Sequence, residues 1–105
     1  MEISKQDWLL FREKVPQWQE NYMDRLNREY IDLLSADRPA SEKFWALEER
    51  IKEDSKRPGA ILEFRKRDVA YQIAVMLYDK AIPAEDLEGF SDELKDAVNL
   101  FLNER

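Results

Sequence analysis

The chain of 105 residues contains no cysteine and no histidine, and each absence removes whole classes of function. Without cysteine there is no disulfide, no thiolate nucleophile and no cysteine-ligated zinc or iron–sulfur cluster. Without histidine the chain lacks the commonest general base and the commonest ligand of transition metals. Catalytic Ser-His-Asp triads and Cys-His pairs are therefore excluded. Carboxylates, Lys, Arg, Tyr and Ser remain for any chemistry.

Long hydrophobic runs are also missing. The longest unbroken apolar stretch is residues 73–78, whereas a membrane-spanning helix needs about 20 residues. The N-terminal residues are mixed in charge, unlike a secretory signal, in which a basic segment precedes an apolar run. We therefore expect no membrane span and a cytoplasmic location.

Glycine and proline are scarce, with 2 and 4 residues, and they fall at natural breaks in the pattern. Alternation of apolar and polar residues is absent, and apolar residues recur at intervals of three and four instead, which is typical of helices. The sequence therefore predicts an all-α fold: one domain over residues 1–105, built as a small bundle of four to five helices.

The first predicted helix is unusually long. Ser4 is its expected N-cap, with Asp7 three residues later as a weak capping box. One apolar face then continues through Trp8, Phe11, Val15, Trp18, Tyr22, Leu26, Tyr30 and Leu33. Pro16 leaves two alternatives, a long helix kinked at Pro16 or two helices that meet there. An unbroken helix would be about 45 Å long, so it must bend or project beyond a compact chain about 33 Å across.

Three further helical segments follow a loop at residues 35–41. The second carries Phe44, Leu47 and Ile51 on one side and ends at Pro58-Gly59. The third is expected to run from Ala60 to Lys80, and residues 69–78 are apolar all round, which favours the central element of the fold or a subunit interface. After a short acidic turn at 84–88, Ser91 is expected to cap a last helix with an apolar stripe at Leu94, Val98 and Phe101.

Charge is unevenly distributed along this acidic chain, which has a net charge of −6. Residues 50–67 hold seven bases and three acids, whereas residues 68–105 hold three bases and nine acids. Nucleic-acid binding would use the bases Lys56, Arg57, Arg65, Lys66 and Arg67. The overall negative charge and the lack of a base-reading motif argue against it. We favour pairing of these bases with the acidic C-terminal third, within the chain or across a dimer.

Four carboxylates have the spacing of a possible magnesium or manganese site. Glu49 and Glu53 are four residues apart, and Glu93 and Asp96 are three apart, so each pair shares a helical face. If the pairs faced each other they could hold a hard cation, as in all-α nucleotide hydrolases. Basic neighbours at Arg50 and Lys52 oppose this hypothesis. Solvated helix faces are the simpler interpretation, and we predict no cofactor.

Aromatic side chains are the best candidates for an interaction site. Trp8, Trp18, Tyr22 and Tyr30 share the long first stripe, and Trp45 lies in the second helix. Aromatic residues dominate both core packing and interface anchoring, so both interpretations stay open.

Three sequence blocks resemble a family of short, uncharacterised bacterial proteins. The blocks are residues 16–19 continuing into 22–27, residues 41–45, and Asp86-Leu87 with residues 90–94. The resemblance covers the whole chain and implies a compact helical protein. It supplies no catalytic motif, so no site residue is carried over.

The sequence thus favours a non-catalytic protein–protein interaction module that self-associates, as a homodimer, through helical apolar faces. The alternatives are a carboxylate-metal hydrolase acting on nucleotides and an accessory protein associated with nucleic acid.

Overall fold

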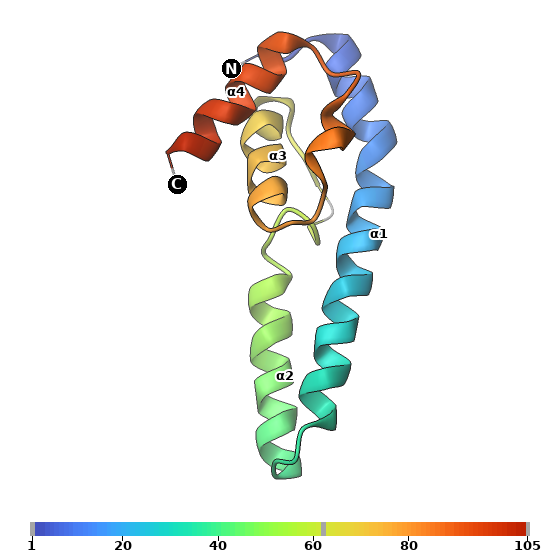
Figure 1. Ribbon diagram of the computed structural model, residues 1–105, viewed down its shortest axis with the longest axis vertical. Helices are drawn as coiled ribbons and strands as arrows, with labels where there is room; N and C mark the ends of the chain where they lie inside the picture. The colour runs from blue at the N-terminus through green and yellow to red at the C-terminus, as the bar shows by residue number, and fades with distance from the viewer. Residues whose placement is uncertain (1, 62, 105) are drawn as a thin grey trace.

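The computed structural model describes residues 2–61 and 63–104, and four α-helices form its framework (Figure 1). They are α1 (Lys5–Ser35), α2 (Ala40–Asp54), α3 (Val69–Tyr78) and α4 (Asp92–Asn103). Two single turns of 3₁₀ helix, η1 (Lys66–Asp68) and η2 (Ala84–Leu87), precede α3 and α4. No strand occurs in these residues, so the predicted all-α class is confirmed.

Helix α1 is continuous through Pro16, which decides between the two alternatives left by the sequence. Ser4 caps it as predicted, because the Ser4 hydroxyl accepts the backbone N–H of Asp7 at 3.1 Å. Pro16 has no N–H to donate to the Arg12 carbonyl. Val15, directly before Pro16, and Trp18, two residues after it, are both buried in the core. The helix curves gently along the molecule (Figure 1).

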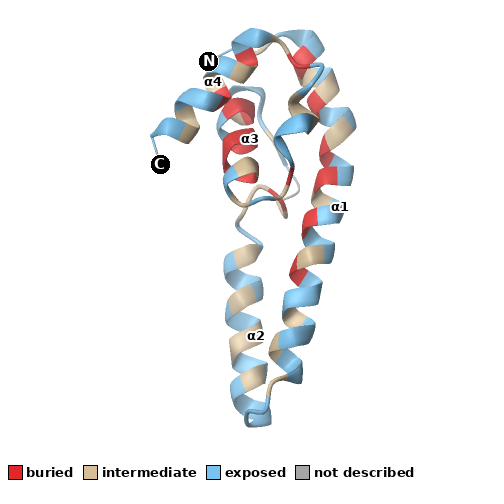
Figure 2. Cartoon of the chain, viewed as in Figure 1, coloured by how far each residue is buried: buried red, intermediate tan, exposed pale blue. Residues whose placement is uncertain are grey.

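The core lies at one end of the molecule, between α3, α4 and the first half of α1 (Figure 2). Helix α3 is its centre, as its apolar sequence predicts, since residues 69, 70 and 72–76 are all buried. Leu94 and Val98 of α4 cover one side of α3, and Phe11, Val15 and Trp18 of α1 cover another. The Trp18 indole N–H donates to Asp86 in η2 at 3.0 Å, which satisfies its only polar atom.

The third predicted helix is too long at its N-terminal end, because α3 begins at Val69 and not near Ala60. The amide of Gln19 donates to the carbonyls of Pro58 and Ile61, which holds this stretch against α1 in a non-helical path. Phe64 then packs edge-on against Phe11 at 5.1 Å. These tertiary contacts outweigh the local helix preference. Leu62, also placed in this helix by the sequence, lies outside the described residues.

A buried carboxylate joins the beginnings of α1 and α4. Asp7, 4% exposed, accepts the backbone N–H of Ser91 at 2.9 Å and its hydroxyl at 2.5 Å. The Ser91 oxygen in turn accepts the backbone N–H of Leu94 and caps α4, as the sequence predicts. The capping box expected at Asp7 is therefore incomplete, since its carboxylate binds Ser91 rather than returning to Ser4.

We expect Asp7→Ala to lower the free energy of unfolding by about 1–3 kcal/mol, because the Ser91 N–H and hydroxyl lose their buried partner. Urea denaturation followed by circular dichroism measures the change. Asp92→Ala is the matched control, because Asp92 is an exposed carboxylate in the first turn of α4, next to Ser91. Equal losses in the two variants would contradict a special role for Asp7.

A joint connects this core to the far half of α1. Tyr22 is buried there against Gly59, so closely that a Cβ at Gly59 would lie 2.3 Å from a ring carbon of Tyr22. Arg57 binds Asp79 with two hydrogen bonds, at 2.7 and 2.8 Å. Arg25 of α1 donates to the carbonyls of Asp79 and Lys80, both at 2.7 Å, at the C-terminal end of α3. These groups fix the direction in which α1 and α2 leave the core.

Gly59→Ala is expected to lower the free energy of unfolding by about 1–3 kcal/mol, as overpacking of a filled interior does. Thermal and urea denaturation measure this loss. The same substitution made in a Tyr22→Leu background should cost much less, because the ring that meets the new methyl group is gone. A loss of the same size in both backgrounds would show that the ring is not the cause.

Candidate interaction surface

The far half of α1 and the whole of α2 form a helical hairpin that projects from the core, here called the arm (residues 23–54; Figure 1). The arm makes the molecule long, with extents of 51 × 27 × 23 Å. No residue of α2 is buried, and within the arm only Leu26 of α1 is (Figure 2). Helix α2 thus packs against a single neighbour and leaves most of its surface open.

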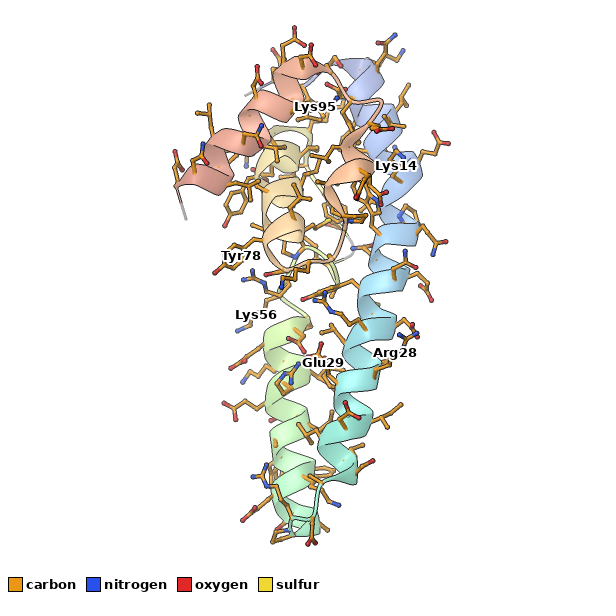
Figure 3. All side chains as sticks on the ribbon, viewed as in Figure 1. Lys14, Arg28, Glu29, Lys56, Tyr78 and Lys95 are labelled. Carbon is orange, nitrogen blue, oxygen red and sulfur yellow. The ribbon has the colours of Figure 1, made fainter. Side chains whose placement is uncertain are left out.

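Polar contacts hold the two helices of the arm together. The Tyr30 hydroxyl donates to Asp54 at 2.6 Å, and Arg50 pairs with Glu29 at 2.9 Å. Glu29 lies between the two helices, whereas Arg28 lies on the outer side of α1 (Figure 3). Near the tip, the Lys43 ammonium donates to the carbonyls of Leu34 and Ala36 at the end of α1. The arm is therefore joined by hydrogen bonds and leaves much of its apolar surface exposed.

Two apolar stripes lie on one side of the arm, and together we call them the arm face. On α1 the stripe is Met23, Tyr30 and Leu34, which are seven and four residues apart. On α2 the stripe is Phe44, Leu47 and Ile51, which are three and four residues apart. Each spacing keeps the side chains on one helical face. Met23, Tyr30 and Ile51 line the same pocket, which places both stripes on one side. The arm face consists of Met23, Tyr30 and Leu34 with Phe44, Leu47 and Ile51.

The arm face is exposed where a core face would be covered. Phe44 is 62% exposed, and Leu34 and Ile51 are 44% and 46% exposed. Scattered apolar residues are normal on a protein surface, whereas a contiguous apolar group on one side marks an interaction site. The arm face is accordingly our candidate interaction surface.

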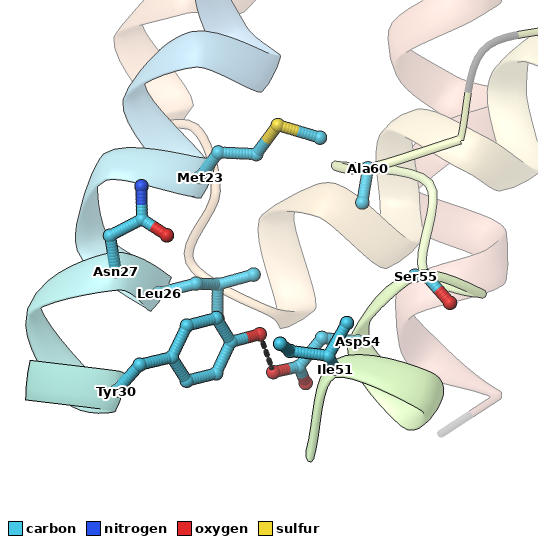
Figure 4. A pocket seen from close by; sticks show the side chains of 8 residues that line it. All are labelled: Met23, Leu26, Asn27, Tyr30, Ile51, Asp54, Ser55 and Ala60. Carbon is cyan, nitrogen blue, oxygen red and sulfur yellow. Dashed lines mark hydrogen bonds between the residues drawn. The ribbon is translucent and has the colours of Figure 1, made fainter. Parts of the chain in front are cut away.

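A pocket of about 280 Å³ opens in the arm face near the joint (Figure 4). Met23, Leu26 and Ile51 supply most of its apolar wall, and Ala60 closes one end. Four polar residues also line it: Asn27, Tyr30, Asp54 and Ser55. The Tyr30 hydroxyl donates to the Asp54 carboxylate, and the Ser55 hydroxyl donates to the backbone carbonyl of Lys52. Burial first, and then the hydrogen bond and charge of Asp54, raise the pKa of Tyr30 above its usual value of 10.0.

The five predicted aromatic residues occupy different environments. Trp18 and Tyr22 are only 4% and 5% exposed, so in this conformation they pack inside the chain. Trp8 is half-buried beside Phe11, with Arg12 and Lys66 each 5.8 Å from its ring centre. Tyr30 belongs to the arm face, and Trp45 is exposed next to Phe44, edge to face at 4.8 Å.

Phe44 and Leu34 are not among the interaction residues predicted from the sequence, although the apolar spacing that contains each of them is visible in the sequence. Phe44, Leu47 and Ile51 were recognised as one stripe, and such a stripe predicts a covered face without saying what covers it. Leu34 lies one turn beyond Tyr30 on the same side of α1.

The four carboxylates proposed for a metal do not come together. Glu49 and Glu53 lie on the arm, whereas Glu93 and Asp96 lie on α4 at the opposite end of the molecule (Figure 1). All four are exposed, and within residues 2–61 and 63–104 no group of three or more carboxylates could hold a metal ion. The two pairs expected to face each other therefore do not.

The predicted basic group is divided between two kinds of environment. Arg57 is neutralised by Asp79, whose hydrogen bonds raise the pKa of the guanidinium. Arg65, Lys66 and Arg67 are exposed around η1, and no described carboxylate lies within ion-pair distance of them. Within the described chain, the expected pairing with the acidic C-terminal third is formed by Arg57 alone.

Comparisons with protein-family models, with curated proteins and with solved structures found no match to this chain. In the part of the chain that the structure describes, none of the helices is both long enough and apolar enough to cross a membrane.

Ionisation of Tyr30 gives a test of the arm's polar contacts. Because the folded state raises the pKa of Tyr30 while an unfolded tyrosine ionises near pH 10, its stabilisation is complete below pH 10 and declines as the pH rises above that value. Tyr30→Phe should lose about 1 kcal/mol at pH 7, through the missing hydrogen bond.

Above pH 10 the stability of Tyr30→Phe should decline less steeply with pH than that of the unsubstituted chain. Urea denaturation between pH 7 and 11 measures both slopes. Burial also raises the pKa of Tyr22, which remains in both proteins and accounts for a shared residual slope. Parallel curves would refute the assignment to Tyr30.

Proposed function

We propose that this chain is a non-catalytic interaction protein that self-associates through the arm face. The observation that carries the proposal is a set of exposed apolar side chains on one side of a hairpin whose second helix buries no residue. The absence of histidine and cysteine supports a role without catalysis, as does the wide separation of the four candidate carboxylates.

The exposed area supports a second copy as partner. The chain exposes 7385 Å², whereas size scaling gives roughly 6,200 Å² for a compact chain of this mass. The excess of about 1,200 Å² is larger than the roughly 800 Å² that each partner buries in a standard interface. The radius of gyration, 16.0 Å, likewise exceeds the value of about 13 Å typical of this length.

The chemistry of the arm face also fits a partner of the same kind. A twofold interface brings the same patch of both copies together, so the patch must be complementary to itself. An apolar face opposite an identical apolar face meets this requirement, whereas a face of one charge would repel its copy. Two hairpins packed in this way form a four-helix bundle, in which helices cross at about 20°.

Sedimentation velocity should show a monomer–dimer equilibrium that shifts toward dimer as the concentration rises. Leu34→Glu should weaken dimer formation at least tenfold, because it places a charge in the apolar interface. Leu100→Glu is the matched control, since Leu100 is 66% exposed on α4, outside the arm, and it should leave the equilibrium unchanged.

Two results would defeat this proposal. One is a monomer at every concentration up to the millimolar range. The other is a dimer that Leu100→Glu disrupts and Leu34→Glu does not, because such a dimer would use α4 and not the arm.

A further inference from the structure

The arm face carries both a projecting ring and an open pocket. Phe44 stands near the tip and is 62% exposed. Ile51, seven residues later on the same stripe, lines the pocket. Seven residues correspond to about 10 Å along a helix, so the ring and the pocket are two turns apart on the same surface.

The pocket suits an apolar side chain. Three of its four polar lining residues are engaged within the chain, because the Tyr30 hydroxyl donates to Asp54 and the Ser55 hydroxyl donates to the Lys52 carbonyl. Asn27 is the fourth, and the other lining residues, Met23, Leu26, Ile51 and Ala60, are apolar. A cavity of about 150 Å³ lined by apolar groups is enough to hold a benzene ring, and this pocket has about 280 Å³. A phenylalanine ring therefore fits, with room for part of the neighbouring helix.

The ring cannot enter the pocket of its own chain, because Phe44 and Ile51, which lines the pocket, are held two turns apart on the same helix, α2. A second copy can bring them together. If the twofold axis passes across the arm near Leu47, midway between Phe44 and Ile51, the tip of each arm lies over the pocket of the other. A parallel arrangement would instead place tip beside tip and leave both pockets empty.

We propose that the pocket is the receptor for Phe44 of a second copy, in an antiparallel pair of arms with two identical ring-in-pocket contacts. This inference rests on the proposed function, since it specifies how the arm faces meet. Trp45, edge-on to Phe44 at 4.8 Å, lies beside the inserted ring and limits its rotation. Each copy thus supplies one ring and one pocket.

The test uses two variants of the whole chain. Phe44→Ala removes the ring and keeps the pocket. Ser55→Phe, at an exposed residue on the pocket wall, fills the pocket from within and keeps the ring. Each alone should raise the dimer dissociation constant at least tenfold. A 1:1 mixture should form a heterodimer tighter than either homodimer, because the intact ring of one copy meets the intact pocket of the other.

Two controls match these variants. Leu100→Ala removes an equally exposed apolar side chain outside the arm. Lys52→Phe adds a ring to α2 at an exposed residue that does not line the pocket. Both should keep the dissociation constant of the unsubstituted chain. Sedimentation with one variant labelled fluorescently measures all of these equilibria, and recovery of binding on mixing shows that both variants are folded.

The outcomes separate the two proposals. If the unsubstituted chain never dimerises, both fail. If it dimerises and Leu34→Glu weakens the dimer, but Phe44→Ala and Ser55→Phe do not, the arm face is the interface and the pocket is not its receptor. Weakening by both variants without recovery on mixing would likewise overturn the ring-in-pocket contact.

Discussion

The length of α1 is the constraint on which the rest of the structure depends. A helix of 31 residues is about 46 Å long, and the remaining elements can cover only part of it. The first half of α1 receives α3, α4 and the chain between them, and its buried residues become core. Beyond the joint, the second half of α1 packs against α2. A long amphipathic helix and a short chain therefore produce both parts of the molecule: a packed core at one end and an arm with an uncovered face at the other.

The joint between these parts is mainly polar, and this has a physical reason. Helix α1 passes from a buried to an exposed environment near Tyr22, so the contacts there must tolerate partial solvation. Hydrogen bonds from Arg25 and Gln19 to backbone carbonyls meet this need, because they satisfy groups at helix ends and in loops that would otherwise need water. The Arg57–Asp79 pair adds directionality, since a guanidinium held by two hydrogen bonds allows little rotation. The direction of the arm is thus fixed by directional hydrogen bonds more than by buried apolar area.

Much of this fold could be predicted from the sequence, because local patterns decide it. The apolar stripe gave the course of α1, Ser4 and Ser91 gave two helix starts, and the apolar stretch at 69–78 identified the centre of the core. The segment before α3 could not be predicted, because Gln19 and Phe11 decide its path from more than 40 residues away in sequence. The candidate surface was missed for a related reason. Periodicity shows that Phe44 and Ile51 share a face, whereas their exposure depends on how many other helices reach the arm.

The link between Asp7 and Ser91 has a practical consequence for anything attached to this chain. It holds the start of α1 beside the start of α4, and both lie at the end of the molecule opposite the hairpin tip (Figure 1). A reporter or surface tether fused at the N-terminal side would be carried some 50 Å from the tip, the long dimension of the molecule. Immobilised in that orientation, the hairpin would point away from the support and remain accessible.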